Sequence, residues 1–427
     1  MNSTDRDKPI LTETKLMSTD PTQALSNIRV LDLSRVLAGP WASQHLADLG
    51  AEVIKIERPR TGDDTRGWGP PYLKDLVNAD SKESAYYLSA NRGKKSVTVN
   101  LSSAEGQEII RQLAKESDVF IENFKVGDVA RYGISYEDLK KVNPRLIYCS
   151  ITGFGQDGPR SSLPGYDFII QAMGGLMSVT GKQDNALGGG PQKGGIAVSD
   201  LMAGLFSAVA ILAALVSRNI TNQGQFIDIA LLDCQIAGIS GLNMNYLTSG
   251  VIPGRRGNAH ENIVPYQVFS AKDCEFVVAC GNDPQFAKLC KLMEAPTLSS
   301  DPKFTKNDGR VKNREALIPL LQDIFKEQPA DSWITKMERA GVPCGLINNI
   351  AQVFEDPQVK HRQMLIELPH PKSGHVTLVA NPIKLFGTPI RYNLAPPTLG
   401  QHTREILTSL GGVSNAEYDA LVEKKIV

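Results

Sequence analysis

The chain has 427 residues, and its 46 Lys and Arg residues balance its 46 Asp and Glu residues. A net charge of zero removes the electrostatic signal expected of a protein that binds nucleic acid or an anionic membrane, so we expect neither partner. The length suggests two or three domains of roughly 150 residues each and allows a large buried core.

Residues 1–25 are rich in Ser, Thr, Asp and Pro and contain no apolar block. A secretory signal needs such a block and an organelle transit peptide avoids acidic residues, so we expect a disordered tail, with Met17 as an alternative start. The six cysteines form no Cys-x-x-Cys pair, which indicates free thiols in a reducing, cytoplasmic compartment. The six histidines form no close ligand pair, so no metal site is expected.

Strand and helix patterns alternate along the front half of the chain. Strands are predicted at residues 28–34, 51–57, 96–101, 118–122 and 146–151, and a strand that leads into a helix is predicted at residues 224–232. Helices are predicted after residue 38, after a capping box formed by Ser102 and Glu105, and from near Ser135. This alternation predicts an α/β fold with a parallel sheet covered on both faces. Ligands of such sheets bind at the carboxyl ends of the strands.

The loops that follow these predicted strands carry several cations. They are Arg35, Arg58, Arg60 and Lys125, with Arg131 just beyond. Cations gathered at one edge of a sheet suit the phosphate groups of a ligand. A solvated basic rim explains each single residue equally well.

Asp200 stands at the head of an apolar run, residues 201–216, and follows a predicted loop at residues 194–199. A carboxylate beside so much apolar surface is costly unless it is hydrogen-bonded or takes part in chemistry. At a helix N-terminus it would be held ionised yet poorly hydrated, which suits a nucleophile. The alternative is that Asp200 or Ser199 is simply the N-cap. The run is short for a membrane span, so we expect a helix inside a soluble core.

The rear half of the chain is more mixed. A strand is predicted at residues 275–280, with helices near 283–292, 314–327 and 331–340, a hairpin at 363–368 and 375–379, and a last helix opened by residues 399–405. Asp331 or Ser332 is the expected cap of the third of these helices, and Gly341 its end. The glycine-rich stretch 188–195 lacks the ending of a P-loop and is either a ligand-approaching loop or a linker.

Several of these segments together resemble the class III CoA-transferases. They are residues 35–40, 49–59, 62–66, 91–96, 119–124, 150–155, 165–167 and 198–200, in this order. The resemblance runs from about Leu25 to the C-terminus. It implies a large domain with a nucleotide-binding-like parallel sheet and a smaller α+β domain, in an interlocked homodimer.

The resemblance also implies a division of the chain. Residues 1–25 would be the tail, 26–225 the N-terminal part of the large CoA-binding domain, 226–350 a linker and the small domain, and 351–427 a C-terminal segment that returns to the large domain.

The family's catalytic aspartate falls on Asp200. This carboxylate would attack an acyl-CoA, form a mixed anhydride and then carry CoA as a thioester before passing it to an acceptor acid. CoA enters as the acyl-CoA substrate, and no permanently bound cofactor is implied. Water must be excluded, because both intermediates hydrolyse.

Further contacts are implied by the same resemblance. Residues expected to bind CoA are Leu37, Ala38, Arg58, Asn123, Phe124, Arg131 and Tyr166. Tyr166 would lie near the thioester, with Asp167 as a nearby acid. His260 is expected to contact the polar part of the substrate, although a surface turn histidine explains it as well.

Within the family, residues 65–71, 263–267 and 399–403 resemble the branch that transfers CoA between succinate and hydroxymethylglutarate. The expected donor is therefore succinyl-CoA and the expected acceptor a dicarboxylate such as glutarate or hydroxymethylglutarate. One alternative is a 2-methylacyl-CoA racemase, but that group keeps a His where Tyr166 stands, and Tyr is a poor base at neutral pH. Another alternative is a CoA-binding protein without turnover, against which the intact Asp200 argues.

Overall fold

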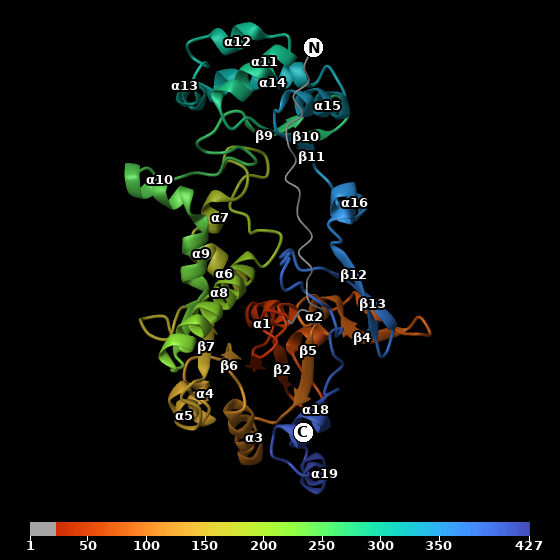
Figure 1. The fold of residues 1–427 in the computed structure, drawn as a ribbon. Helices are drawn as coiled ribbons and strands as arrows, with labels where there is room; N and C mark the ends of the chain where they lie inside the picture. The colour runs from red at the N-terminus through yellow and green to blue at the C-terminus, as the bar shows by residue number, and fades with distance from the viewer. Residues whose placement is uncertain (1–22) are drawn as a thin grey trace, which may run out of the picture.

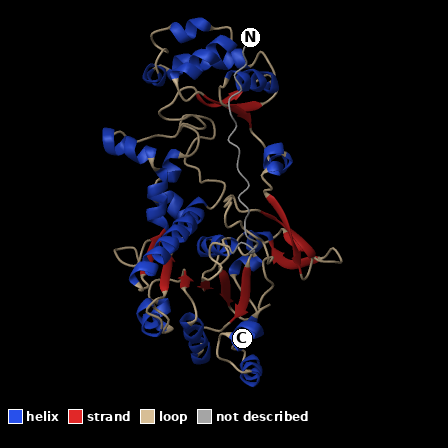
Figure 2. Ribbon diagram, viewed as in Figure 1, coloured by secondary structure: helices blue, strands red, loops and turns tan. Residues whose placement is uncertain are grey.

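A six-stranded parallel sheet forms the centre of the larger part of the molecule (Figures 1 and 2). The structure is a computed structural model and describes residues 23–427. The strands lie in the order β5 (Lys94–Thr98), β2 (Glu52–Glu57), β1 (Arg29–Asp32), β6 (Val119–Glu122), β7 (Ile147–Thr152) and β8 (Phe226–Ala230). Every neighbouring pair is parallel, so the predicted α/β fold with a parallel sheet is confirmed.

The strand order reverses beside β1. The chain builds outward from β1 to β2 and β5, then returns to place β6, β7 and β8 on the other side. Such a reversal opens a crevice outside the carboxyl ends of the two central strands, because the loops that follow them turn in opposite directions. The loops after β1 and β6 therefore border the expected ligand site.

Alternate side chains of the central strands face two different helix layers. Leu31 and Phe120 share one buried core with the helices α3 (Ala104–Lys115) and α5 (Tyr136–Val142). Val30 and Val119 share another with α1 (Ala38–Asp48), α8 (Val198–Thr221) and α9 (Leu231–Ile239). This burial of both faces explains why the strands read as nearly continuous apolar runs.

Two predicted caps of these and later helices differ in the structure. Helix α3 is capped by Ser103, whose hydroxyl accepts a hydrogen bond from the N–H of Gly106, so the box predicted at Ser102 is shifted by one residue. The helix start predicted near Ser135 is confirmed, and Ser135 and Asp138 form a capping box there. Helix α15 begins after Pro329 without a side-chain cap, because the chain enters the helix one residue earlier than predicted.

The long apolar helix α8 is buried on one face only. By length and composition alone it would be able to cross a membrane. Its inner face packs on α1 and α9, whereas Leu205, Val209, Ala213, Val216 and Ile220 form an exposed outer stripe. The prediction of a helix inside the core is therefore wrong for this outer stripe of the single chain. A helix that is apolar all round needs a further covering surface.

A second core lies at the far end of the molecule from the parallel sheet (Figure 1). An antiparallel sheet of β9 (Tyr266–Ser270), β10 (Glu275–Ala279) and β11 (Cys344–Leu346) is covered by α11 (Asp283–Leu292), α12 (Pro296–Ser300), α13 (Asn307–Lys312), α14 (Arg314–Phe325) and α15 (Ala330–Ala340). Phe276, Phe325 and Trp333 pack together at its centre. Gly341 ends α15 in the left-handed conformation, as predicted.

The remaining elements connect these two parts or line the parallel sheet. They are η1 (Asp64–Gly67), β3 (Tyr72–Lys74), β4 (Asp80–Ser84), α2 (Ala85–Ser89), α4 (Asp128–Arg131), α6 (Asp167–Met173), α7 (Leu176–Val179), α10 (Gly241–Ser249), α16 (Ile350–Glu355), α17 (Pro357–His361), β12 (Leu365–His370), β13 (Gly374–Val379), α18 (Thr403–Ser409) and α19 (Asn415–Glu423). The predicted hairpin is confirmed as β12 and β13. The helix expected to be the last, α18, is followed by α19, so that prediction is wrong.

Both ends of the described chain lie against the parallel sheet. The N–H of Thr98 donates to the hydroxyl of Thr403 at 3.0 Å, and the N–H of Asn100 donates to the carbonyl of Ile426 at 2.7 Å. At the other end, the N–H of Leu25 donates to the carbonyl of Leu49 at 2.9 Å, so the last residues of the predicted tail are tied to the core. The rest of that tail, residues 1–22, lies outside the described residues. The proposed domain boundaries stay predictions.

Candidate active site

A cavity of about 420 Å³ lies at the carboxyl edge of the parallel sheet. The loops after β1, β6 and β7 and the first residues of α6, α8 and α9 line it. Among its lining residues are Leu37, Ala38, Asn123, Phe124, Arg131, Tyr166, Asp167 and Asp200, all singled out from the sequence. The fold thus brings together residues as far apart in the chain as Leu37 and Asp200, because parallel strands present their carboxyl ends at one edge.

Asp200 is the third residue of α8, and its carboxylate is not used to cap that helix. The N-cap position is Ala197, which makes no side-chain hydrogen bond. The hydroxyl of Ser199 donates to the side chain of Gln235 at 2.7 Å, so Ser199 is not the cap either. Within residues 23–427 no group donates a hydrogen bond to the carboxylate of Asp200. The N-cap alternative is therefore wrong, and the carboxylate borders the cavity without a protein partner.

Asp167, from the first turn of α6, takes over the capping of α8. Its Oδ1 atom accepts hydrogen bonds from the backbone N–H groups of Ser199, at 2.8 Å, and of Asp200, at 3.4 Å. Its Oδ2 atom accepts from the side-chain amide of Gln171 at 2.6 Å. Asp167 therefore fixes the helix end that carries Asp200.

Burial and the neighbouring charge of Asp167 raise the pKa of Asp200 to about 7. Both causes disfavour the ionised form, since a half-buried carboxylate loses hydration and a second carboxylate repels it. Sequence reasoning expected the helix N-terminus to hold Asp200 ionised. The structure instead gives a carboxyl group that exchanges its proton near neutral pH, as a tuned reactive group does.

The loop that carries Tyr166 is held close to the end of β7 by two glycines. The Cα atoms of Gly153 and Gly165 pack so closely that a Cβ added to Gly165 would lie 2.2 Å from the Cα of Gly153. Only glycine permits this approach of one backbone to another. Tyr166 follows directly and lies largely exposed at the cavity, at the N-cap position of α6.

The cations predicted to bind phosphates are partly neutralised by carboxylates. Arg35 and Arg58 both form ion pairs with Asp64, and Arg131 pairs with Asp128. Arg35 and Arg131 line the main cavity, with Lys125. Arg58 lines an adjoining cavity of about 270 Å³ that shares Arg35, Phe124 and Asp128 with the first. Arg60 lines neither cavity.

His260 lies apart from these residues. It lines a separate cavity of about 210 Å³, next to Arg256 and Glu261, and its ring packs beside Tyr266 with 5.3 Å between centroids. Its Nδ1 atom accepts a hydrogen bond from the N–H of Asn262 at 3.0 Å. Within this single chain, the structure does not bring His260 to Asp200.

The glycine-rich stretch 188–195 lines no part of the Asp200 cavity. The N–H of Gly194 donates to Gln171 at 2.8 Å, and Gln171 also donates to Asp167. This stretch therefore supports the capping carboxylate from behind. Among the residues that the structure describes, no group of three or more His, Cys, Asp or Glu is arranged to hold a metal ion.

The profile of CoA-transferase family III matches residues 25–403. The chain belongs to this family. It is thus a family III CoA-transferase, as the resemblance of its motifs predicted.

The similar proteins include transferases of known substrates. The chain is 44% identical to a succinate–glutarate CoA-transferase of Agrobacterium fabrum over 90% of this chain and 95% of that one. It is 44% identical to the human succinyl-CoA:glutarate CoA-transferase over 90% of this chain and 85% of that one. A crystal structure of a CAIB/BAIF family protein from Brucella suis is 45% identical, with a TM-score of 0.79, and covers 91% of this chain and 100% of its own.

Sequence reasoning missed one residue near the reacting centre of this CoA-transferase. Burial and the negative charges of Asp200 and Asp167 raise the pKa of Tyr86 to about 12. Trp68 packs edge-on against the ring of Tyr86, with 5.1 Å between centroids. Tyr86 lies on the short helix α2, which no pattern predicted. The closest segment of the sequence that carried part of the family resemblance is Asn91–Ser96, which does not include Tyr86.

Proposed function

We propose that this CoA-transferase moves CoA from succinyl-CoA to glutarate or a similar dicarboxylate, with Asp200 as the nucleophile. The observation that carries the proposal is the carboxylate of Asp200, which borders the cavity at the sheet edge and has no hydrogen-bond donor among residues 23–427. The choice of succinate and glutarate rests on the printed activities of the relatives in Agrobacterium fabrum and human.

The reaction takes place in four steps. An oxygen of Asp200 attacks the thioester carbon, the C–S bond breaks, and CoA thiolate leaves behind a mixed anhydride. The thiolate then attacks the aspartyl carbonyl of that anhydride and releases succinate, so that Asp200 carries CoA as a thioester. The acceptor carboxylate attacks this thioester, which frees the thiolate and forms a second anhydride. The thiolate finally attacks the acceptor acyl carbon and releases Asp200.

The surroundings of Asp200 suit these steps. Anhydride and thioester have similar acyl-transfer potential, so the free-energy change of each step is small. Both intermediates hydrolyse if water enters. The apolar body of α8 and the small residues Ala38 and Gly165 leave room for a thioester beside Asp200 while limiting hydration. CoA is a substrate here, and no permanently bound cofactor is part of the proposal.

The nucleotide of CoA would follow the two adjoining cavities. Arg58 and Arg131, which line these cavities, would meet its phosphates, and Asn123 and Phe124 would contact the chain between phosphate and thiol. Leu37 and Ala38 would lie beneath it, and Tyr166 near the thioester. His260 would serve the acceptor acid only if a second chain brings it close.

We also propose a homodimer. The exposed apolar stripe of α8 supports it, since residues such as Val209, Val216 and Ile220 are 63%, 64% and 83% exposed in the single chain. An apolar surface of this kind marks an interaction site more often than a free surface.

The nucleophile is tested by Asp200→Ala and Asp200→Asn, with Asp233→Asn as the matched control. Asp233 lies in the first turn of the neighbouring helix α9 and is exposed. We expect both Asp200 variants to lose CoA transfer to background, by a factor of about 10⁴ or more, while acyl-CoA still binds. The control should retain full activity. Hydroxylamine trapping followed by peptide mass mapping should find residue 200 modified after incubation with succinyl-CoA.

The substrate pair is tested by offering succinyl-CoA with a panel of carboxylic acids. We expect glutarate and related dicarboxylates to give higher kcat/KM values than monocarboxylates. Turnover that persists in both Asp200 variants, or an unmodified Asp200 peptide during turnover, would remove the covalent mechanism.

A further inference from the structure

The turn between β1 and α1 contains a strained residue. Val36 has a φ of 71°, in the left-handed region. A β-branched side chain rarely adopts this conformation, because its Cβ approaches the following carbonyl oxygen. Such a residue persists only where the surroundings over-determine it, and such residues cluster at functional sites. Val36 lines the cavity next to Leu37 and Ala38.

Each residue of this turn is fixed by a different partner. The backbone of Ser34 lies between two buried charges: its N–H donates to Asp32 at 2.9 Å and its carbonyl accepts from the ammonium of Lys55 at 2.9 Å. The N–H of Arg35 donates to the side-chain oxygen of Asn123 at 2.8 Å, and the carbonyl of Arg35 accepts from the side-chain nitrogen of Asn123 at 2.7 Å. These hydrogen bonds are made by the backbone and do not depend on the side chains of Ser34 and Arg35.

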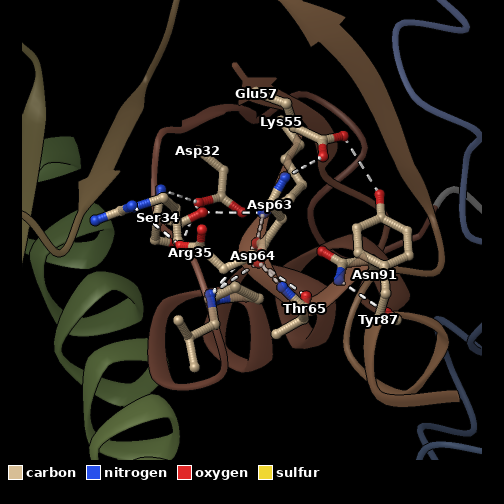
Figure 3. Close-up of polar contacts among 12 residues, drawn as sticks. Asp32, Ser34, Arg35, Lys55, Glu57, Asp63, Asp64, Thr65, Tyr87 and Asn91 are labelled. Carbon is tan, nitrogen blue, oxygen red and sulfur yellow. Dashed lines mark hydrogen bonds and ion pairs between the residues drawn. The ribbon is translucent and has the colours of Figure 1, made fainter. Parts of the chain in front are cut away.

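The partner of Val36 is the carboxylate of Asp63. The N–H of Val36 points at both of its oxygens, each at 3.3 Å. Lys55 holds the same carboxylate at 2.9 Å, and Thr65 donates to it from its backbone N–H at 3.0 Å and from its hydroxyl at 2.8 Å. Figure 3 shows Lys55 and Asp63 within one polar cluster with Asp32 and Ser34.

This cluster is buried and charged. Asp32 and Lys55 are fully buried, and Asp63 is 2% exposed. Although burial opposes ionisation, the charge of Lys55 and the hydrogen bonds from Thr65 lower the pKa of Asp63 to about 2. Buried ion pairs seldom stabilise a fold more than apolar packing would, so we infer that this charged cluster has a role other than stability.

We propose that Asp63 is a positioning residue for CoA transfer: its carboxylate holds the strained Val36 turn so that Leu37 and Ala38 lie against the acyl-CoA beside Asp200. Asp63 does not line the Asp200 cavity. It borders the adjoining cavity beside Arg58, and its hydrogen bond to the N–H of Val36 is the link to the Asp200 cavity. This inference rests on the proposed function of the cavity. Asp63 is needed because a positive φ is costly at a residue that has a Cβ.

Substitutions at Val36 separate this role from simple stabilisation of the fold. Glycine adopts a φ of 71° without penalty, whereas alanine shortens the side chain but keeps the Cβ. If Asp63 holds the turn against strain, Val36→Gly should remove most of the need for it. Val36→Ala is the matched control, because it removes nearly the same side-chain contact and leaves the strain.

The experiment measures kcat/KM for succinyl-CoA in full-length protein with Asp63→Ala, and with Asp63→Asn in case the former does not fold. Each is made in the wild-type, Val36→Gly and Val36→Ala backgrounds. We expect loss of Asp63 to lower kcat/KM by about tenfold or more with valine or alanine at position 36, because a misplaced contact at a reacting centre is costly. With glycine there, we expect a loss within about threefold.

Two further measurements complete the test. Asp48→Asn removes a buried carboxylate that pairs with Arg92 at the other end of α1. It should lower the unfolding temperature as Asp63→Asn does, but leave kcat/KM within about twofold. In the otherwise unchanged chain, Val36→Gly should unfold at a higher temperature than Val36→Ala.

Equal losses of kcat/KM in all three backgrounds would overturn the positioning role of Asp63. A Val36→Ala variant as stable as Val36→Gly would overturn the strain on which it depends. Neither result touches Asp200, whose role fails only if Asp200→Ala retains transfer or the trapped peptide is unmodified.

Discussion

Asp167 accepts a hydrogen bond from the backbone N–H of Asp200, so that two carboxylates from different helices meet at the first turn of α8. The carboxylate of Asp167 accepts hydrogen bonds from the backbone of α8, and the carboxylate of Asp200 borders the cavity. The pKa of Asp200 is therefore raised and its carboxylate has no donor in the described part of the chain, while the N–H groups at the start of α8 are still hydrogen-bonded by Asp167.

The first prediction concerns the pH dependence of transfer. With a pKa of about 7, Asp200 is protonated on the acidic side and cannot attack a thioester there. We expect kcat/KM for succinyl-CoA to fall about tenfold per pH unit below about pH 7. In Asp167→Asn the repelling charge is gone, so the midpoint should move down by about one unit. The measurement is a pH–rate profile of both proteins, and an unmoved midpoint in the variant would contradict this explanation.

A second prediction follows for stability, with the opposite sign to that of an ordinary carboxylate. Because folding raises the pKa of Asp200, the folded state holds a proton that the unfolded chain has released between about pH 4 and pH 7. Stability linked to Asp200 is therefore present at low pH and lost as the pH rises through about 7. At pH 8, Asp200→Asn should be more stable than the original chain by about 1 kcal/mol, allowing for solvent screening.

Chemical denaturation at pH 8 and at pH 4.5 measures this difference. We expect the gain from Asp200→Asn to shrink strongly at the lower pH, since the carboxyl group is then neutral in the folded protein. A gain that is the same at both values would show that ionisation of Asp200 has no part in it.

A third prediction separates binding from chemistry at the nucleotide end. Arg58 lines the cavity adjoining that of Asp200 and is exposed, with Asp64 as its partner. Arg58→Ala should raise KM for succinyl-CoA about tenfold and change kcat less than about twofold, because a phosphate contact is equally strong before and during reaction. Arg60→Ala is the control, since Arg60 lines neither cavity. Steady-state kinetics decide it, and an unchanged KM would place the phosphates elsewhere.

The fourth prediction concerns the outer stripe of α8. Val209→Asp and Val216→Asp place charges on a surface that the proposed homodimer would bury, and burying an unpaired charge is costly. We expect the variants to elute as monomers in size-exclusion chromatography with light scattering. Val422→Asp on α19, an exposed valine far from α8, should leave the assembly unchanged (Figure 1). A dimer that tolerates both α8 charges would assign the stripe another partner.

Local patterns in the chain were enough to predict most of the parallel sheet. Periodicity and turn residues act over a few positions, so the strands β1, β2, β6 and β7 were predicted to within about two residues. Caps were less secure, as the shift from Ser102 to Ser103 shows, because two adjacent serines offer the same hydroxyl and only the backbone path selects one. The open outer face of α8 was not predictable, since both faces of the helix carry apolar residues.

By itself the sequence determined the alternation of strands and helices, the clustering of ligand-binding loops at one sheet edge, and Asp200 as the residue to examine. These depend on short-range periodicity and on the general rule that parallel strands end together. Only the tertiary structure decided that Asp167 caps α8, that the charges of Asp167 and Asp200 act on Tyr86, and that Asp63 accepts a hydrogen bond from the strained Val36. Each of these joins segments distant in the chain, and its energy depends on burial and on distances of a few ångströms, which no local pattern encodes.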